Sequence, residues 1–94
     1  MSIVLAAVSL VQEQWAQARS YCERALPLVI AESNPQRLAI TLFYLSRARF
    51  ELGDHEQGMQ DAQKALALFR DIQDEQWEVL TKQYLAEMQA RSEH

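Results

Sequence analysis

Residues 51–58 read "ELGDHEQG", and this stretch holds both glycines of the 94-residue chain. Gly53 can take the left-handed backbone that ends a helix, and Asp54 with Gln57 has the Asp-x-x-Gln spacing of a capping box that begins one. Gly58 allows two helices to approach closely, at a cost of about 1 kcal/mol in helix propensity relative to alanine. The stretch therefore predicts a tight turn between two paired helices.

The chain matches itself at a shift of forty residues. "ERALPL" at 23–28 aligns with "QKALAL" at 63–68, and "TLFYLSR" at 41–47 aligns with "TKQYLAE" at 81–87. The matched positions are mostly apolar or small, as repeated helix packing would require. A period of roughly 20 to 50 residues indicates a stacked array of structural repeats.

Within each period the apolar spacing is helical. Met59, Ala62, Leu66 and Phe69 follow one face of a helix, and the segment before them carries two apolar lines, which predicts packing on two sides. We expect five helices, near residues 2–12, 14–32, 35–52, 55–73 and 75–91.

Individual residues predict where two helices begin and where one helix is distorted. Asn34 is a good N-cap ahead of Pro35, which suits a first helical turn, and Asp74 can cap the last helix in the same way. Pro27 lies inside the predicted helix 14–32, where it removes one hydrogen bond and crowds a carbonyl. We predict a kink there, or alternatively an early end and a restart.

The segment "LFYLSRARFELGDHEQGMQDAQKALAL" at 42–68 resembles a tetratricopeptide repeat. The matching positions are Leu42, Leu45 and Ser46 in the first helix, Gly53 and Asp54 in the turn, and Gly58, Ala65 and Leu66 in the second helix. Three positions depart from the pattern, because Arg49 replaces a tyrosine and His55 and Ala62 replace aromatic residues. These departures predict a less tightly filled middle repeat, with His55 as a wedge in the turn.

The resemblance implies an all-α, superhelical array of antiparallel helical hairpins, with about five helices in two and a half repeats. We expect one domain over 1–94, with repeats near 1–33, 34–73 and, in part, 74–94. The period of about forty residues resembles the long-helix variety of the family. Such an array buries its core only between neighbours, yet "IVLAAVSLV" at 3–11 is apolar nearly all round. We therefore expect a piece of a longer protein, a self-associating chain, or both.

Composition excludes several classes of function. The net charge is −4 without a basic stripe, which argues against binding to nucleic acid. The longest apolar stretch has nine residues, short of the roughly 18 to 20 that cross a bilayer, so no membrane association is expected. The single cysteine permits no internal disulfide, and no signal peptide is recognised, so we expect a cytoplasmic protein.

No catalytic or metal-binding pattern is present, and we expect neither an enzyme nor a cofactor. His55 and Glu56 would need a second histidine at Met59 to form a zinc protease helix. Cys22 would need a nearby base to act as a nucleophile, and its repeat position instead predicts a buried, inert thiol. The carboxylates are predicted at caps and on solvated faces. They are Asp54, Glu56, Asp61, Asp71, Asp74 and Glu75.

The resemblance places partner binding in a concave groove that is lined by the first helices of successive repeats. The candidate residues are Phe43, Tyr44, Arg47, Phe50, Glu51, Gln83, Tyr84, Glu87 and Arg91. Aromatic residues and arginine commonly anchor interfaces. The aromatics can equally pack neighbouring helices, so Arg47 is the stronger candidate. The Lys and Asn residues with which some members grip chaperone tails are not reproduced.

The sequence thus predicts a non-catalytic scaffold for a protein or peptide partner, part of a larger signalling or regulatory protein and self-associating, as a dimer, through exposed apolar helices. One alternative is a sensory domain that binds a signalling peptide. A second is a helical oligomerisation module, against which the internal repeat argues.

Overall fold

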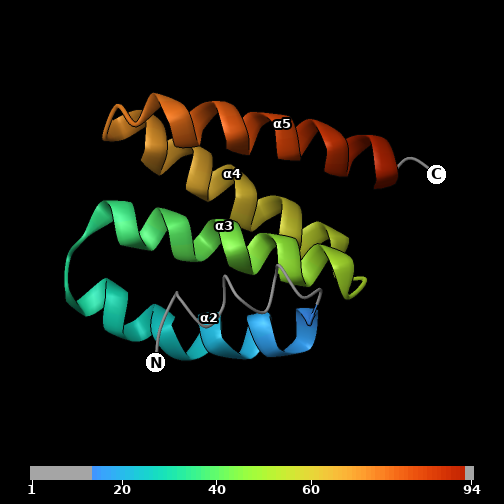
Figure 1. Cartoon of the computed structure of the whole chain (residues 1–94), viewed down its shortest axis with the longest axis horizontal. Coiled ribbons are helices and arrows are strands. Elements are labelled where there is room, and N and C mark those ends of the chain that lie inside the picture. The colour runs from blue at the N-terminus through green and yellow to red at the C-terminus, as the bar shows by residue number, and fades with distance from the viewer. Residues whose placement is uncertain (1–13, 93–94) are drawn as a thin grey trace.

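The computed structural model describes residues 14–92, which form four antiparallel helices joined by tight turns (Figure 1). The helices are α2 (Trp15–Ala31), α3 (Pro35–Glu51), α4 (His55–Asp71) and α5 (Glu75–Ser92). Each bound lies within two residues of its prediction, and the predicted all-α array of hairpins is confirmed for this part of the chain. Four helices are therefore seen where five were expected, because the segment 2–12 lies outside the described residues.

The inner helix of the array is α3, which packs on α2 along one side and on α4 along the other, while α4 also packs on α5 (Figure 1). This arrangement confirms the two-sided packing that its two apolar lines predicted. The buried residues of α3 are Ala39, Thr41, Leu42, Phe43, Leu45, Ser46, Ala48 and Phe50.

The forty-residue repeat is visible in equivalent side chains of α3 and α5. Thr41 and Thr81 are both fully buried, and each hydroxyl donates a hydrogen bond of 2.7 Å to the backbone carbonyl four residues earlier. Leu45 and Leu85 are also both buried. The two helices therefore place the same columns of the repeat against their neighbours.

An aromatic cluster connects α3, α4 and α5. The ring of Trp77 stacks on Phe69 at a centroid distance of 5.3 Å and meets Phe43 edge to face at 5.5 Å. Edge-to-face and offset aromatic pairs stabilise a core beyond the area they bury. Between α2 and α3 the buried side chains include the small Ala18, Cys22 and Ala48, and Trp15 and Tyr44 pack against them.

The three turns that join the described helices each use one residue with a left-handed backbone, and these residues are twenty positions apart. These residues are Ser33 (φ 55°), Gly53 (φ 97°) and Gln73 (φ 58°). Gly53 confirms its predicted role, and its amide donates to the carbonyl of Phe50 in the pattern that closes a helix C-terminus. Ser33 and Gln73 adopt the same left-handed conformation although they are not glycines, so their residue types did not predict it.

The predicted caps are confirmed at two helix starts and wrong at the third. The Asn34 side chain accepts a hydrogen bond from the amide of Arg37 at 3.1 Å, and Asp74 accepts one from the amide of Trp77 at 3.4 Å. Asp54 makes no side-chain cap. The predicted capping box does not form, since the Asp54 amide donates to the carbonyl of Arg49 at 2.9 Å. The Gln57 side chain donates to the buried carboxylate of Asp61 at 3.2 Å.

Pro27 lies inside α2, which runs without interruption from Trp15 to Ala31. The alternative of an early end and a restart is therefore wrong, and the kink stays a prediction. Pro27 is on the exposed side of α2, where water can reach the carbonyl that its ring deprives of a helical partner.

Gly58 lies where the backbones of α3 and α4 approach closely. A Cβ atom at this position would lie 2.9 Å from the carbonyl oxygen of Ser46 and 3.0 Å from the amide nitrogen of Phe50. Both are backbone atoms, which cannot rotate aside. The interpretation of Gly58 as a close-contact residue is confirmed.

We expect Gly58→Ala to lower the free energy of unfolding by about 1 to 3 kcal/mol, because overpacking outweighs the gain in helix propensity. Urea unfolding followed by circular dichroism measures this change. Ala67→Gly, at an exposed site of the same helix, reports the propensity change alone. An unchanged or more stable Gly58→Ala protein would show that the two helices can separate at little cost.

Candidate partner-binding face

The nine predicted contact residues all lie on α3 and α5, but they differ in exposure. Phe43 and Phe50 are buried, with exposed fractions of 3% and 1%. The partly exposed residues are Tyr44, Arg47, Glu51 and Tyr84, and the exposed ones are Gln83, Glu87 and Arg91.

Phe43 and Phe50 have the surroundings of core residues. This agrees with the alternative that these aromatic residues pack neighbouring helices. The ring of Phe43 meets those of Tyr44 and Tyr84 at 5.9 and 5.8 Å. Phe50 belongs to a buried cluster between α3, α4 and α5. His55 stacks on Phe50 at 4.3 Å and thereby supplies the flat ring that the turn was predicted to lack.

Arg47 lies between two aromatic rings. Its Cζ atom is 5.0 Å from the ring centroid of Tyr84 and 5.8 Å from that of Trp15, both within the range of cation–π attraction. The Nε atom of Arg47 and the hydroxyl oxygen of Tyr84 are both buried, and neither makes a hydrogen bond within residues 14–92. Trp15 was missed as a site residue because its repeat position predicted only packing between helices.

The two phenols near Arg47 stay neutral at ordinary pH. Burial raises the pKa of Tyr84, and the adjacent Arg47 guanidinium opposes only part of this shift. Burial also raises the pKa of Tyr44, an effect to which the Cys22 thiol adds and which Arg47 opposes. Neither tyrosine therefore supplies a negative charge to balance Arg47.

The exposed ends of α3 and α5 are joined by an ion pair between Glu51 and Arg91. This hydrogen bond to Glu51 raises the pKa of Arg91 above its ordinary value. The Cζ atom of Arg91 also lies 5.0 Å from the ring of Phe50. Two of the predicted contact residues are thus already paired with each other.

A second polar cluster, centred on Arg49, ties three helices together. Its guanidinium lies 2.8 Å from the carboxylate of Asp61 on α4 and 3.2 Å from that of Glu23 on α2. The Asp61 side chain is only 3% exposed, so its predicted place on a solvated face is wrong. Arg49 occupies the position where the family pattern has tyrosine, and an ion pair replaces the packing of that ring.

Cys22 is buried, as predicted, with an exposed fraction of 1%. Burial raises the pKa of its thiol to about 12, so the group stays protonated and unreactive near neutral pH. Among residues 14–92, no group of three histidine, cysteine or carboxylate side chains has an arrangement that could hold a metal ion. In the same range, no helix is long and apolar enough to cross a membrane.

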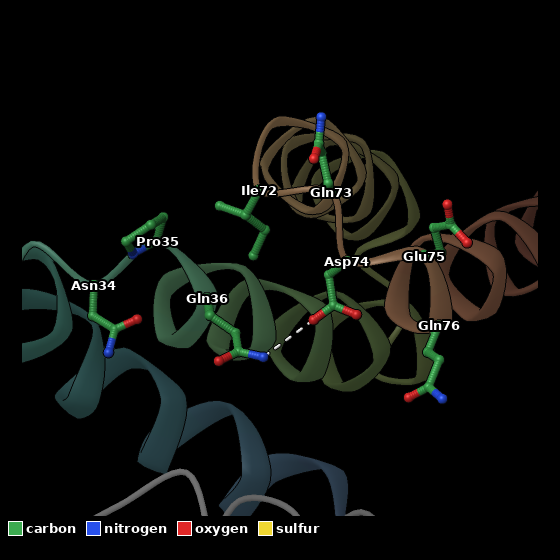
Figure 2. Close-up of a pocket in the computed structure, with 8 residues that line it drawn as sticks. All are labelled: Asn34, Pro35, Gln36, Ile72, Gln73, Asp74, Glu75 and Gln76. Atoms are coloured by element: carbon green, nitrogen blue, oxygen red, sulfur yellow. Dashed lines mark hydrogen bonds between the residues drawn. The ribbon is translucent and has the colours of Figure 1, made fainter.

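A hollow of about 550 Å³ lies between the α2–α3 turn and the α4–α5 turn (Figure 2). Gln36 donates a hydrogen bond of 3.1 Å to Asp74 across it, whereas Gln73 and Glu75 point away from this pair. Its lining is polar and open, unlike the enclosed apolar pockets that hold small molecules. None of the nine predicted contact residues lines it.

The stacked helical hairpins define a helical repeat protein. A tetratricopeptide repeat family model matches residues 1–71 of the 94, and the chain belongs to this family. Repeats of this family generally mediate protein–protein interaction and scaffolding. No curated protein and no solved structure matches the chain.

Proposed function

We propose that the chain is a non-catalytic scaffold that captures a protein or peptide on the contact face, defined as Trp15, Tyr44, Arg47 and Tyr84. The observation that carries this proposal is that two partly exposed aromatic rings, of Trp15 and Tyr84, lie within 6 Å of the Arg47 guanidinium. A third, Tyr44, is near enough for the charge of Arg47 to influence its pKa. Tryptophan, tyrosine and arginine are the residue types that supply most of the binding energy at protein interfaces.

The packing beneath this face supports the same function. Phe43 is buried directly beneath it and contacts the rings of Tyr44 and Tyr84. Side chains that are held in place before binding lose less conformational entropy when a partner arrives. The contact face is therefore suited to recognising a fixed shape.

The setting that we propose is a larger cytoplasmic signalling or regulatory protein. A sensory domain that binds a signalling peptide would use the same contact face and would differ only in its ligand. An enzyme is disfavoured, because the single thiol is protonated and the carboxylate of Asp61 is held by Arg49.

Quantitative affinity capture from native lysate tests this function. Arg47→Glu should reduce the recovery of specific partners by roughly tenfold, since interface arginines often contribute more than about 1.4 kcal/mol. Arg24→Glu makes the same charge change at an exposed site on α2 and should leave recovery unchanged. Circular dichroism confirms that both variants are folded. Equal recovery by both would show that the contact face is not the binding surface.

We further propose self-association through exposed apolar helices. The apolar first segment that motivated this prediction lies outside the described residues, but α5 offers a second case. Val79 is 53% exposed, whereas its equivalent in α3, Ala39, is fully buried. Further α5 residues are exposed where their α3 equivalents are buried. These are Gln83, Ala86 and Ala90, against Phe43, Ser46 and Phe50.

Light scattering after size exclusion tests self-association. The wild-type chain should form dimers at high micromolar concentration. Val79→Glu should weaken them, because a second copy would otherwise cover the exposed apolar side chain of Val79. Gln63→Glu, at an exposed position of α4, serves as the charge control. A wild-type chain that stays monomeric would contradict the proposal.

A further inference from the structure

We propose that two copies of the chain associate by exchanging α5: each copy opens its α4–α5 turn and packs its α5 on α4 of the other copy. This inference rests on the proposed self-association and names the element that is exchanged. It is carried by the turn around Gln73, which differs from the other two turns that join the described helices.

The α4–α5 turn requires a left-handed backbone at a residue that is not glycine. Gln73 has φ 58°, a conformation that is unfavourable for a residue with a Cβ atom. Gly53 takes a left-handed backbone in the α3–α4 turn, with φ 97°, and does not carry this cost. The strain at Gln73 is removed when the α4–α5 turn straightens into helix.

The sequence of the α4–α5 turn is compatible with a continuous helix. Residues 71–76 read "DIQDEQ", without glycine or proline. Ser33 in the α2–α3 turn has a similar φ of 55°, but Pro35 follows it and would crowd the carbonyl of Ala31 in a continuous helix. Of the three turns, the α4–α5 turn is therefore the one that combines strain with a sequence able to become helical.

Straightening the turn keeps its backbone hydrogen bonds satisfied. In the turn, the amide of Gln73 donates to the carbonyl of Arg70 at 3.1 Å, and the amide of Asp74 donates to that of Phe69 at 2.9 Å. In a continuous helix both amides donate to carbonyls four residues earlier, and the first amides of α5 gain acceptors of the same kind. The joined helix would run over residues 55–92, about 57 Å at 1.5 Å per residue.

The side-chain hydrogen bonds that hold the turn closed are weak. The turn borders the open hollow of Figure 2, where Gln36 donates to Asp74 in a hydrogen bond of 3.1 Å between exposed side chains. The bond from the amide of Trp77 to the Asp74 cap is long, at 3.4 Å. Opening the turn therefore gives up little side-chain bonding.

The contacts that seat α5 can form equally well on a second copy. The ring of Trp77 stacks on Phe69 of α4 at 5.3 Å, and Leu85 and Met88 share a buried cluster with Phe50. Another copy whose own α5 has moved away offers the same surface, which is the condition for domain swapping. Exchange thus conserves the buried contacts and removes the strain of two turns, against the entropy cost of association.

The dissociation constant of the dimer tests the role of the turn, with analytical ultracentrifugation after the monomer and dimer fractions have become constant. Gln73→Gly relieves the left-handed strain and weakens the continuous helix, so the constant should rise by about a hundredfold or more. Asp74→Ala removes the cap of the separate α5 helix and should lower the constant. Ser33→Gly is the matched control, because it relieves strain in a turn that both forms keep, and it should leave the constant unchanged.

NMR on a mixture of ¹³C-labelled and unlabelled wild-type chains tests the exchange directly. A nuclear Overhauser signal should connect Trp77 of one copy with Phe69 of the other, because exchange places these stacked rings in different chains. In a dimer of closed chains both rings belong to the same copy, and this signal between copies is absent. Val79→Glu changes the exposed surface of α5 and not its turn, so the signal should persist in the dimer that remains.

The outcomes separate exchange of α5 from self-association in general. A wild-type dimer without the Trp77–Phe69 signal between copies would overturn the exchange and leave self-association standing. Equal dissociation constants for wild type and Gln73→Gly would do the same, because the turn would then play no part. A wild-type chain that stays monomeric at high micromolar concentration would overturn both proposals.

Discussion

Phe50→Ala is expected to lower the free energy of unfolding by about 3 to 5 kcal/mol, the range for deleting a buried phenylalanine ring. Phe50 is 1% exposed and packs against Leu85 and Met88 of α5 and Ala62 of α4. Its loss would leave a cavity where three helices meet. Urea unfolding followed by circular dichroism measures the change.

This variant separates the two roles considered for Phe50. A core residue should change stability strongly, whereas a partner contact should change binding with little effect on unfolding. His55→Ala is the control, because it removes only the exposed ring of the stacked pair and should cost about 0.5 to 1.5 kcal/mol. A Phe50→Ala protein as stable as wild type would contradict the packing role.

Asp61→Ala should also destabilise the chain, by about 1.5 to 3 kcal/mol, because it removes a buried charged partner of Arg49 while Glu23 still pairs with that arginine. Typical domains have a total stability of about 5 to 15 kcal/mol, so a loss of this size shifts the unfolding midpoint far toward low urea. Glu23→Gln removes the exposed partner of the same arginine and should cost about 0 to 1 kcal/mol.

A double variant distinguishes an uncompensated charge from a simple loss of contact. Replacing Arg49 and Asp61 together by Met and Leu removes both charges and retains apolar volume, which is often neutral or stabilising for buried pairs. We therefore expect it to recover most of the stability lost in Asp61→Ala. A double variant as unstable as the single one would show that packing geometry, and not charge, makes this position sensitive.

The features that the sequence predicted correctly depend on single residues and their immediate neighbours in the chain. Asn34 and Pro35 begin a helix through their own side chains, and Gly53 ends one through its own backbone freedom. The internal repeat then indicated that the helices stack. These signals placed every helix of the described range within two residues.

The unpredicted features depend on which residues meet across helices. Nothing near Asp61 in sequence indicates Arg49, which lies twelve positions away on a different helix. The buried carboxylate also accepts a hydrogen bond from Gln57, the residue that was expected at a helix cap. Local propensity cannot anticipate the pair of Arg49 and Asp61, because the two residues lie on different helices.

The sequence predicted which helices carry the candidate site residues, but it did not predict how deeply each side chain is buried. All nine residues lie on the expected helices, yet a helical column does not show how far into the interface each side chain reaches. Phe43 is buried while Tyr44 beside it is partly exposed, because α4 and α5 cover only part of α3. Trp15 joins the face from the first turn of α2, which sequence spacing alone does not bring near Arg47.

The Arg49 cluster has a consequence for how the array unfolds. In repeat proteins each unit contacts only its neighbours, so cooperativity is set by the strength of each junction. Arg49 makes one junction of α2, α3 and α4, whereas α5 buries only Thr81, Leu85 and Met88. We expect α5 to open first in hydrogen exchange while the other three helices open together. A ligand that bridges Arg47 and Tyr84 would then slow the fraying of α5, so partner binding and completion of the fold would be thermodynamically linked.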